Sequence, residues 1–553
     1  MIRKYYDQFW QWFSSPQSLW AIGVIVGSIL LGFILTFPGL HQWDEEFALR
    51  HSNWILQQYG LYHGDYVLFD NIPEWKATKY YGPLWEFVLG IGAHYVFPFL
   101  HDPIWVRHAL NFSLFPISIF CLFWLLRKMH VACSLSLLLA VVPLGIIRLG
   151  GHSLFNTRDA PAALGFLLST VALWLSFHAV IRATSKKQLI KLCIWIAILV
   201  VVPSLLRMPL FLHLLLSIAV LATINWKKQK TDFSRWPMII IVCFAAGFIT
   251  FLCFPPAWTT SPRELWDILY TLFSYDLHWD HTPLFEHHYP SDNLPWWYAI
   301  FWIPIITHPL LLFCVASGAV LQFCSLIPLG KPLLLRIGTH SVQLSLQRWT
   351  WLCTGFAWII VLLLKPELYD AERQILFLYP TLFFLCMLGL HVLRTRTQWL
   401  LASVLIIVSS FSYIGWGRYS YIYTSPFFPG LTGDMQGDYW GLCKPHAINV
   451  LLDHIPPGTY VRFSEPYVTG AFQRDRLTNT HNWTYDPAFN YSMGPDVPLD
   501  GPPYATIFNN SYRSRIRGPA MIDIRNGKAE IRWQASLPTG EKVCTLIFYS
   551  EMQ

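Results

Sequence analysis

Charged side chains are scarce in this chain. Asp, Glu, Lys and Arg make up 13% of its 553 residues, whereas soluble domains carry roughly 25% charge. Hydrophobic residues reach 54%. This balance excludes a globular enzyme with one apolar region and predicts an integral membrane protein with several spans, in contact with a lipid bilayer.

Several other features are missing. The chain shows no internal repeats, no low-complexity segment and no cleavable signal peptide, so Met1–Lys4 and the apolar run after it indicate an uncleaved anchor. The net charge of +7 does not indicate nucleic acid as a partner, because most basic residues lie in short clusters between apolar segments, where membrane topology explains them.

The eleven cysteines show no metal-binding spacing. Nine lie inside apolar segments, where small packing residues are the ordinary interpretation. Cys443 and Cys544 are the two in the polar tail, and they are a candidate disulfide if the tail faces an oxidising compartment.

About eleven apolar runs are long enough to cross a bilayer. They lie at 20–37, 107–126, 131–148, 160–181, 189–206, 209–225, 237–254, 296–326, 349–364, 374–391 and 398–416. A further run at 82–99 contains polar residues and is bounded by prolines, so we expect a juxtamembrane helix there.

The basic clusters predict the orientation of these spans. With the N-terminus in the cytoplasm, the Lys and Arg clusters all fall on inner loops. The outer side then holds a first loop (38–106), a second loop (255–295) and the tail. We expect a membrane module over 1–417 and an extracytoplasmic α/β domain over 418–553, with strands at Thr459–Ser464, Ala505–Asn509, Ala529–Ala535 and Val543–Tyr549.

The first outer loop carries candidate chemistry. Asp44, Glu45 and Glu46 follow the first span, and a carboxylate there is either a general base or part of a solvated helix start. Further along, Lys79 and Tyr81 precede a Gly-Pro turn and either contact substrate or anchor the chain at the interface.

A short outer loop at 151–161 is dense in polar residues. It contains His152, Asn156, Arg158 and Asp159, and charges at a membrane boundary are costly unless they are paired or used. A helix-start motif is the alternative interpretation.

Three arginines stand at outer ends of spans, against the positive-inside bias: Arg148, Arg207 and Arg373. They either contact an anionic lipid headgroup or place their charge in the interface.

The second outer loop is rich in histidine and acid. It holds His278, His281, His287 and His288 with Asp276, Asp280 and Glu286. Their spacing matches no established metal pattern, so we favour a polar loop and keep His287 and His288 as candidate ligands for a divalent metal.

Taken in order, these motifs resemble the GT-C superfamily of polyprenyl-phosphate-sugar-dependent glycosyltransferases, which includes protein O-mannosyltransferases and aminoarabinose transferases. The likeness covers most of 35–450. It lies in the acidic pair after the first span, Tyr81-Gly82-Pro83-Leu84, Arg107, the His152–Pro161 loop, Leu294–Tyr298 leading to Ile306–Pro309, Glu372-Arg373 and Asp438–Gly441.

The resemblance implies a GT-C fold and an inverting glycosyltransferase in a bacterial inner membrane. Asp44 would be the base, with Glu45 next to it and Asp159 orienting a basic neighbour or a sugar hydroxyl. Arg207 and Arg373, then Arg158, Lys79, Tyr81, His152 and Asn156, would bind a polyprenyl-phosphate-linked donor. The hydroxyl acceptor stays unknown, and so does any cofactor.

Two alternatives remain. A polytopic transporter or flippase would place ionisable residues in the middle of spans and show inverted repeats. A polymerase or ligase that uses a polyprenyl-diphosphate donor would share the topology and differ in donor chemistry.

Overall fold

The structure is a computed structural model. In the part of the chain before the strands of the tail, it describes residues 16–36, 45–63, 82–182, 185–207, 236–255, 281–284, 287–291, 293–326, 355–364, 372–391 and 393–428. In the tail it describes 460–463, 504–509, 530–538 and 542–549, and a few single positions are described between these ranges.

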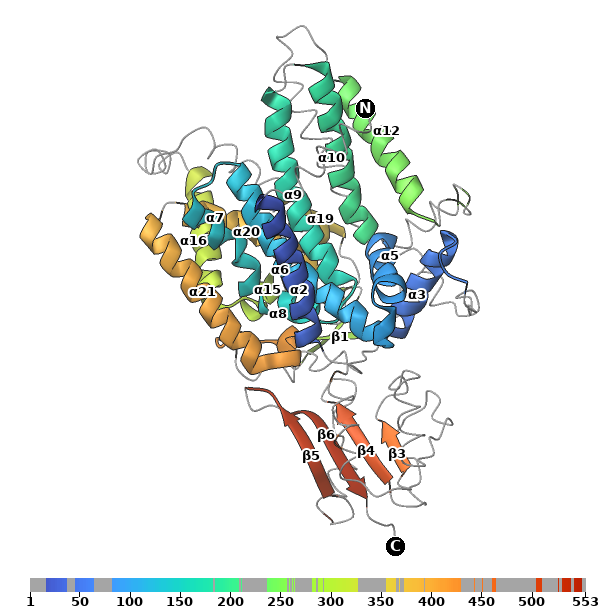
Figure 1. Ribbon diagram of the computed structural model, residues 1–553. Coiled ribbons are helices and arrows are strands. Elements are labelled where there is room, and N and C mark those ends of the chain that lie inside the picture. The colour runs from blue at the N-terminus through green and yellow to red at the C-terminus, as the bar shows by residue number, and fades with distance from the viewer. Residues whose placement is uncertain are drawn as a thin grey trace.

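Helices dominate this part of the chain, which contains 14 α-helices (Figure 1). Within the described residues, four segments are long and apolar enough to cross a membrane: Pro103–Lys128, Asp159–Phe177, Lys187–Leu206 and Thr395–Ile422. They lie in α6 (Pro103–Lys128), α9 (Asp159–Arg182), α10 (Lys186–Leu206) and α21 (Thr395–Trp416) followed by the 3-10 helix η10 (Gly417–Ile422). The composition and these helices are those of an integral membrane protein.

The described part of the chain contains ten further α-helices. They are α2 (Pro16–Leu35), α3 (Glu45–Gln58), α5 (Pro83–Ile91), α7 (Cys133–Ala140), α8 (Ile147–Ser153), α12 (Trp236–Cys253), α15 (Tyr298–Ile306), α16 (Pro309–Leu326), α19 (Phe356–Leu364) and α20 (Phe383–Leu390). Helices thus occur in ten of the eleven predicted spans, and the run at 209–225 lies outside the described residues apart from Leu210.

Two predicted spans are interrupted. The run at 131–148 breaks after α7 into the 3-10 helix η5 (Val142–Gly145), where Pro143 has no N–H to continue the α-helical ladder. The run at 296–326 breaks between α15 and α16, and there Thr307 forms an antiparallel bridge with Ile146. The two breaks therefore lie side by side and pair their freed backbone groups.

Helix α6 shows how local sequence fixes the ends of a span. The Asp102 carboxylate accepts a hydrogen bond from the Trp105 N–H (2.9 Å), and Pro103 follows at the first helical position. Arg127 and Lys128 occupy the last turn. These caps give α6 one acidic end and one basic end.

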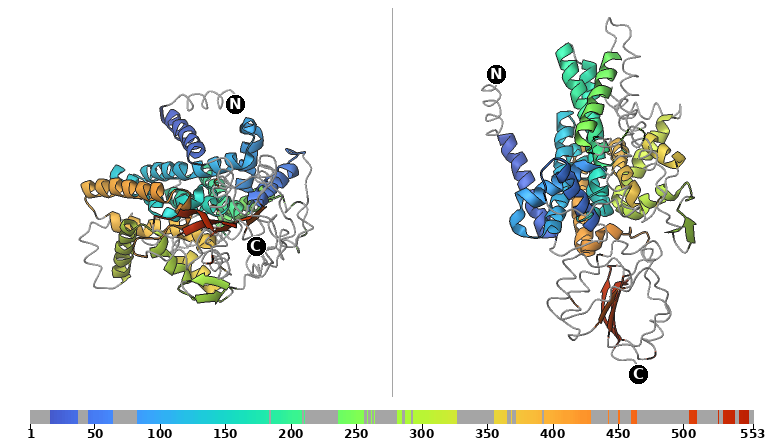
Figure 2. Two further views of the ribbon diagram at one scale, coloured as in Figure 1. Left: turned by 90° about the horizontal axis from the view of Figure 1, so that it is seen from below. Right: turned by 90° about the vertical axis from the view of Figure 1, so that its right-hand side faces the viewer.

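Close backbone contact joins α2 to α6. A Cβ at Gly32 would lie 2.2 Å from the Ala109 carbonyl oxygen, so only glycine allows this approach. Helices α9, α10 and α12 run side by side, as both side views show (Figure 1, Figure 2).

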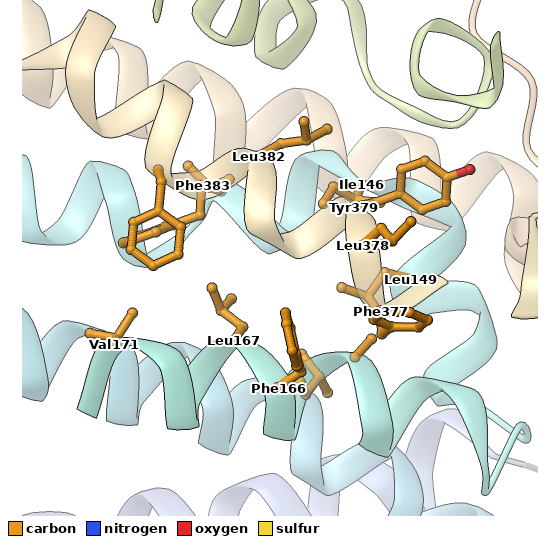
Figure 3. Packing of buried hydrophobic residues seen from close by; sticks show 14 of the residues in the cluster. Ile146, Leu149, Phe166, Leu167, Val171, Phe377, Leu378, Tyr379, Leu382 and Phe383 are labelled. Atoms are coloured by element: carbon orange, nitrogen blue, oxygen red, sulfur yellow. The ribbon is translucent and has the colours of Figure 1, made fainter. Parts of the chain in front are cut away.

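The main core lies between α9 and the 3-10 helix η9 (Arg373–Leu382) with α20 (Figure 3). Phe166 and Phe377 meet edge to face with their ring centroids 5.7 Å apart. Among the other members are Ile146, Leu149, Leu167, Val171, Leu378, Tyr379, Leu382 and Phe383. This packing fixes the position of Arg373, at the start of η9, relative to Asp159, at the start of α9.

The described residues of the predicted first outer loop (38–106) are largely helical. The predicted helix at 82–99 is observed as α5, the π-helix η3 (Gly92–Val96) and the 3-10 helix η4 (Pro98–Leu100). Helix α3 packs against α5 through a buried face that contains Ile55 and Leu56. Its first residue, Glu45, is also buried.

The tail forms a four-stranded sheet, which Figures 1 and 2 place beyond the end of the bundle where α21 ends. The strand order is β3 (Tyr460–Phe463), β4 (Tyr504–Asn509), β6 (Lys542–Tyr549), β5 (Glu530–Ser536). Strands β4, β6 and β5 pair antiparallel, and β3 is parallel to β4. All four predicted strands are confirmed, whereas the helical part of the predicted α/β domain stays a prediction.

Cys544 of β6 is disulfide-bonded, and Cys443 lies outside the described residues. The pairing of these two cysteines therefore stays a prediction.

Candidate functional site

A buried carboxylate meets two arginines where α9 begins. Asp159 forms ion pairs with Arg207 and Arg373, and the Arg373 Nε lies 3.7 Å from Asp159 Oδ2. The Asn156 amide nitrogen donates to the same oxygen (3.0 Å). We call Asp159, Asn156, Arg207 and Arg373 the Asp159 cluster. Its two arginine side chains are 16% and 14% exposed, so neither is fully buried.

Three separate parts of the chain build this cluster. Arg207 directly follows α10, with extended backbone angles (φ −154°, ψ 119°) that carry it out of the helix. The backbone near Arg207 also contacts the Gly-Pro turn, since a Cβ at Gly82 would lie 2.3 Å from the Leu205 carbonyl oxygen. The predicted turn before α5 therefore lies against the end of α10.

A second buried group supports Arg373 from behind. Glu372 accepts a hydrogen bond from Arg148 Nη1 (2.6 Å), and its other carboxylate oxygen lies 3.9 Å from His152 Nε2. Both side chains of the Arg148–Glu372 pair are almost fully buried, at 3% and 0% exposure. A buried pair of this kind is costly to break, so it fixes the residue next to Arg373.

A third group joins α5, α6 and the loop before α9. Glu86 accepts from Arg107 Nη2 (2.6 Å) and from the Thr157 hydroxyl (3.2 Å). Asn111 of α6 donates to the carbonyl oxygens of Ser153 (2.8 Å) and Asn156 (3.1 Å). These bonds hold the 151–161 loop against α6.

The acidic stretch after the first span contributes Glu45 to the bundle. Glu45 is 1% exposed, and its Oε1 lies 2.6 Å from His108 Nε2 of α6. Asp44, Lys79 and Tyr81 lie outside the described residues, so their predicted roles stay predictions.

All three groups, together with the Glu45–His108 pair, lie at one end of the bundle, where α3, α5 and α9 begin and α10 ends. We call this the polar end. Basic residues lie at the opposite ends of α6, α10 and α21: Arg127, Lys128, Lys187, Arg394 and Arg396.

Of the predicted site residues, the structure brings together Asp159, Arg207, Arg373, Asn156 and His152. Arg158, partly buried, occupies the same loop. Sequence reasoning gave no role to Glu86, His108, Asn111 or Thr157. Glu86 and His108 had a usable signal, because each is an ionisable residue within an apolar segment.

The metal hypothesis stays a prediction. Within the described ranges, no three His, Cys, Asp or Glu side chains gather to hold a metal ion. His287 is exposed in a hairpin formed by β1 (His281–Leu284) and β2 (His287–Pro290), and the side chain of His288 lies outside the described set.

No protein-family model matches this chain, and no curated protein matches it.

Proposed function

We propose that this chain is a GT-C-type inverting glycosyltransferase, which moves a sugar from a polyprenyl-phosphate donor to a hydroxyl acceptor at the outer face of a bacterial inner membrane. The observation that carries the proposal is the convergence of Arg207 and Arg373 on Asp159 at the polar end. Guanidinium groups match phosphate oxygens in geometry and charge.

The charge of the Asp159 cluster suits a monophosphate donor. Two guanidinium groups and one carboxylate leave one net positive charge, which balances the single negative charge of a sugar phosphodiester. A diphosphate-linked donor carries a second negative charge that this cluster does not balance. The cluster therefore favours a monophosphate over the polymerase or ligase alternative.

The reaction needs a base opposite the leaving group. Asp44 takes the proton of the acceptor hydroxyl, whose oxygen forms a new bond to the anomeric carbon while the bond to the lipid phosphate breaks. Arg207 and Arg373 stabilise the charge that develops on the leaving phosphate. The proposal is supported by Glu45, which follows Asp44 and is anchored at the same end of the bundle.

Two features support the proposed orientation. The basic residues at the ends opposite to the polar end suit a cytoplasmic face, so the polar end and the tail sheet face the periplasm. The buried ionisable groups of the described chain gather at helix ends rather than at the middle of spans, which disfavours a transporter.

The proposal is tested by identifying the lipid and then the reaction. Mass spectrometry of lipids that co-purify with the full chain should detect a polyprenyl-phosphate sugar. With that donor, Asp44→Asn should remain folded and membrane-inserted but lose transfer, whereas His63→Gln, at an exposed position, should retain it. Unchanged turnover in Asp44→Asn would move the base elsewhere, to Glu45 first.

A further inference from the structure

The side chain of Asn156 has a defined orientation. Its Oδ1 accepts hydrogen bonds from the backbone N–H groups of Arg158 (3.2 Å) and Asp159 (2.9 Å). The Nδ2 group therefore points the other way, where it donates to Asp159 Oδ2 and lies 3.0 Å from His152 Nδ1. An amide nitrogen has only hydrogens to offer, so Nδ1 of His152 must accept.

This contact selects one form of the imidazole. With Nδ1 as acceptor, the proton of neutral His152 sits on Nε2, which faces Glu372 Oε1 at 3.9 Å. A second proton on Nδ1 would oppose the N–H of Asn156 and remove that hydrogen bond. His152 thus links two sides of the site only while it is neutral.

The surroundings of His152 favour the neutral form. Its side chain is fully buried, and burial lowers the pKa of His152, with smaller lowering effects from Arg148 and Arg373; Glu372 acts in the opposite direction. The rings of Phe155 and Tyr421 cover two further sides without charge.

We propose that His152 is a positioning residue: as the neutral Nε2–H tautomer it holds Asp159 through Asn156 and Arg373 through Glu372, and its protonation loosens the arginine pair that binds the anion. The identity of that anion, the donor phosphate, rests on the proposed function. The positioning itself concerns only the geometry of the described side chains.

The size of the effect has an upper bound. An imidazole with a pKa below its ordinary value of about 6.5 leaves at least about a tenth of the molecules neutral at pH 5.5. Apparent affinity falls in proportion to the competent fraction. Affinity for an anion should therefore fall by no more than about tenfold between pH 7.5 and pH 5.5.

The test uses the full chain in lipid nanodiscs and polyprenyl-phosphate glucose as the probe, because the charge of this phosphodiester is constant over that pH range. Wild type should bind more weakly at pH 5.5, and His152→Gln should bind equally at both pH values, since glutamine can accept from Asn156 and donate towards Glu372. His63→Gln is the matched control and should behave as wild type.

A second variant and a second readout keep the test independent of the donor. Asn156→Leu removes the amide through which His152 reaches Asp159, so its binding should change less with pH than that of wild type. The melting temperature of each protein is measured over the same pH range.

The outcomes separate the two proposals. Equal pH dependence of melting and binding in wild type and His152→Gln would overturn the role of His152 and leave the donor proposal intact. A melting profile that depends on His152, with no probe binding at any pH, would support the positioning role and count against the donor.

Discussion

Arg148 and Glu372 stand 224 positions apart in the chain and form a buried ion pair with a distance of 2.6 Å. The Arg148 Nε also donates to the Tyr423 carbonyl oxygen (2.8 Å), and its guanidinium group lies over the Trp302 ring. One side chain of α8 thus connects the residue before η9, helix α15 and the segment after η10. These contacts of Arg148 fix the backbone next to Arg373.

Replacing Arg148 should therefore destabilise the fold. Arg148→Ala leaves the Glu372 carboxylate buried without its partner, and removing one member of a buried pair costs about 3–5 kcal/mol. Thermal melting of the full chain in detergent would measure the loss.

The matched control for this variant is Arg532→Ala on the tail sheet. Arg532 is 44% exposed and pairs with Glu530, and surface pairs contribute about 0–1 kcal/mol. The double variant Arg148→Met/Glu372→Leu should melt above Arg148→Ala, because it removes both charges together. Equal melting of Arg148→Ala and Arg532→Ala would show that the buried pair does not hold the fold.

Gly82 gives a second prediction, which concerns the position of Arg207. A Cβ there would lie 2.3 Å from the Leu205 carbonyl oxygen, so Gly82→Ala must push α5 and the end of α10 apart. We expect weaker anion binding, measured with the same nanodisc assay. Gly247→Ala in α12 is the control, since nothing lies within 4 Å of its added Cβ and alanine favours a helix by about 1 kcal/mol. Wild-type binding by Gly82→Ala would separate this turn from the site.

Arg373 should contribute directly to the affinity for the donor. Hydrogen bonds to charged groups are worth about 1.5–3 kcal/mol, so Arg373→Ala should weaken donor binding by about 10- to 150-fold. Arg373→Lys should recover only part of this, because an ammonium group lacks the planar fork of donors. Isothermal titration with the identified donor, with Arg532→Ala as the control, measures both. Normal affinity in Arg373→Ala would exclude phosphate contact at this position.

The sequence predicted some parts of this arrangement and not others. The four tail strands were predictable because alternating β-branched and aromatic residues are bounded by turns, a signal that depends only on neighbouring residues. The breaks near Pro143 and Thr307 were not, because each break is completed by the backbone of the other. Hydropathy averages over such a break and shows a single span.

The same contrast holds at the polar end. Charge and placement indicated Asp159, Arg207 and Arg373 as candidates, since polar groups at span ends must be paired or used. The pairing of each carboxylate with its basic partner could not be predicted, because Glu45 and His108 lie 63 positions apart and belong to different helices. Pairing across the fold depends on how α3 packs, and no local pattern reports that.

Glu45 gives a test that separates support from chemistry at the acidic stretch. Its carboxylate is buried against His108, so Glu45→Ala leaves a buried imidazole without its partner and should cost about 1–3 kcal/mol. Asp44→Asn should leave the melting temperature unchanged. Melting curves of the two variants, measured beside transfer activity, distinguish the roles. Full stability in Glu45→Ala would show that the pair with His108 does not anchor α3.

Acid should destabilise the protein partly through His94 in the π-helix. Burial lowers the pKa of His94, and Arg107 lowers it further, while Asn53 Oδ1 lies 2.7 Å from its Nε2 and the Tyr62 ring covers another side. Between this lowered pKa and the value of about 6.5 in the unfolded chain, the unfolded state binds more protons, so stability rises with pH in that window. The contribution is complete above pH 6.5 and is lost as the pH falls below it.

His94→Gln, which can keep a hydrogen bond to Asn53, should flatten the dependence of melting temperature on pH between 5 and 7, and His63→Gln should not. Parallel profiles for wild type and His94→Gln would assign the acid sensitivity to other groups, of which His152 also has a pKa lowered by burial.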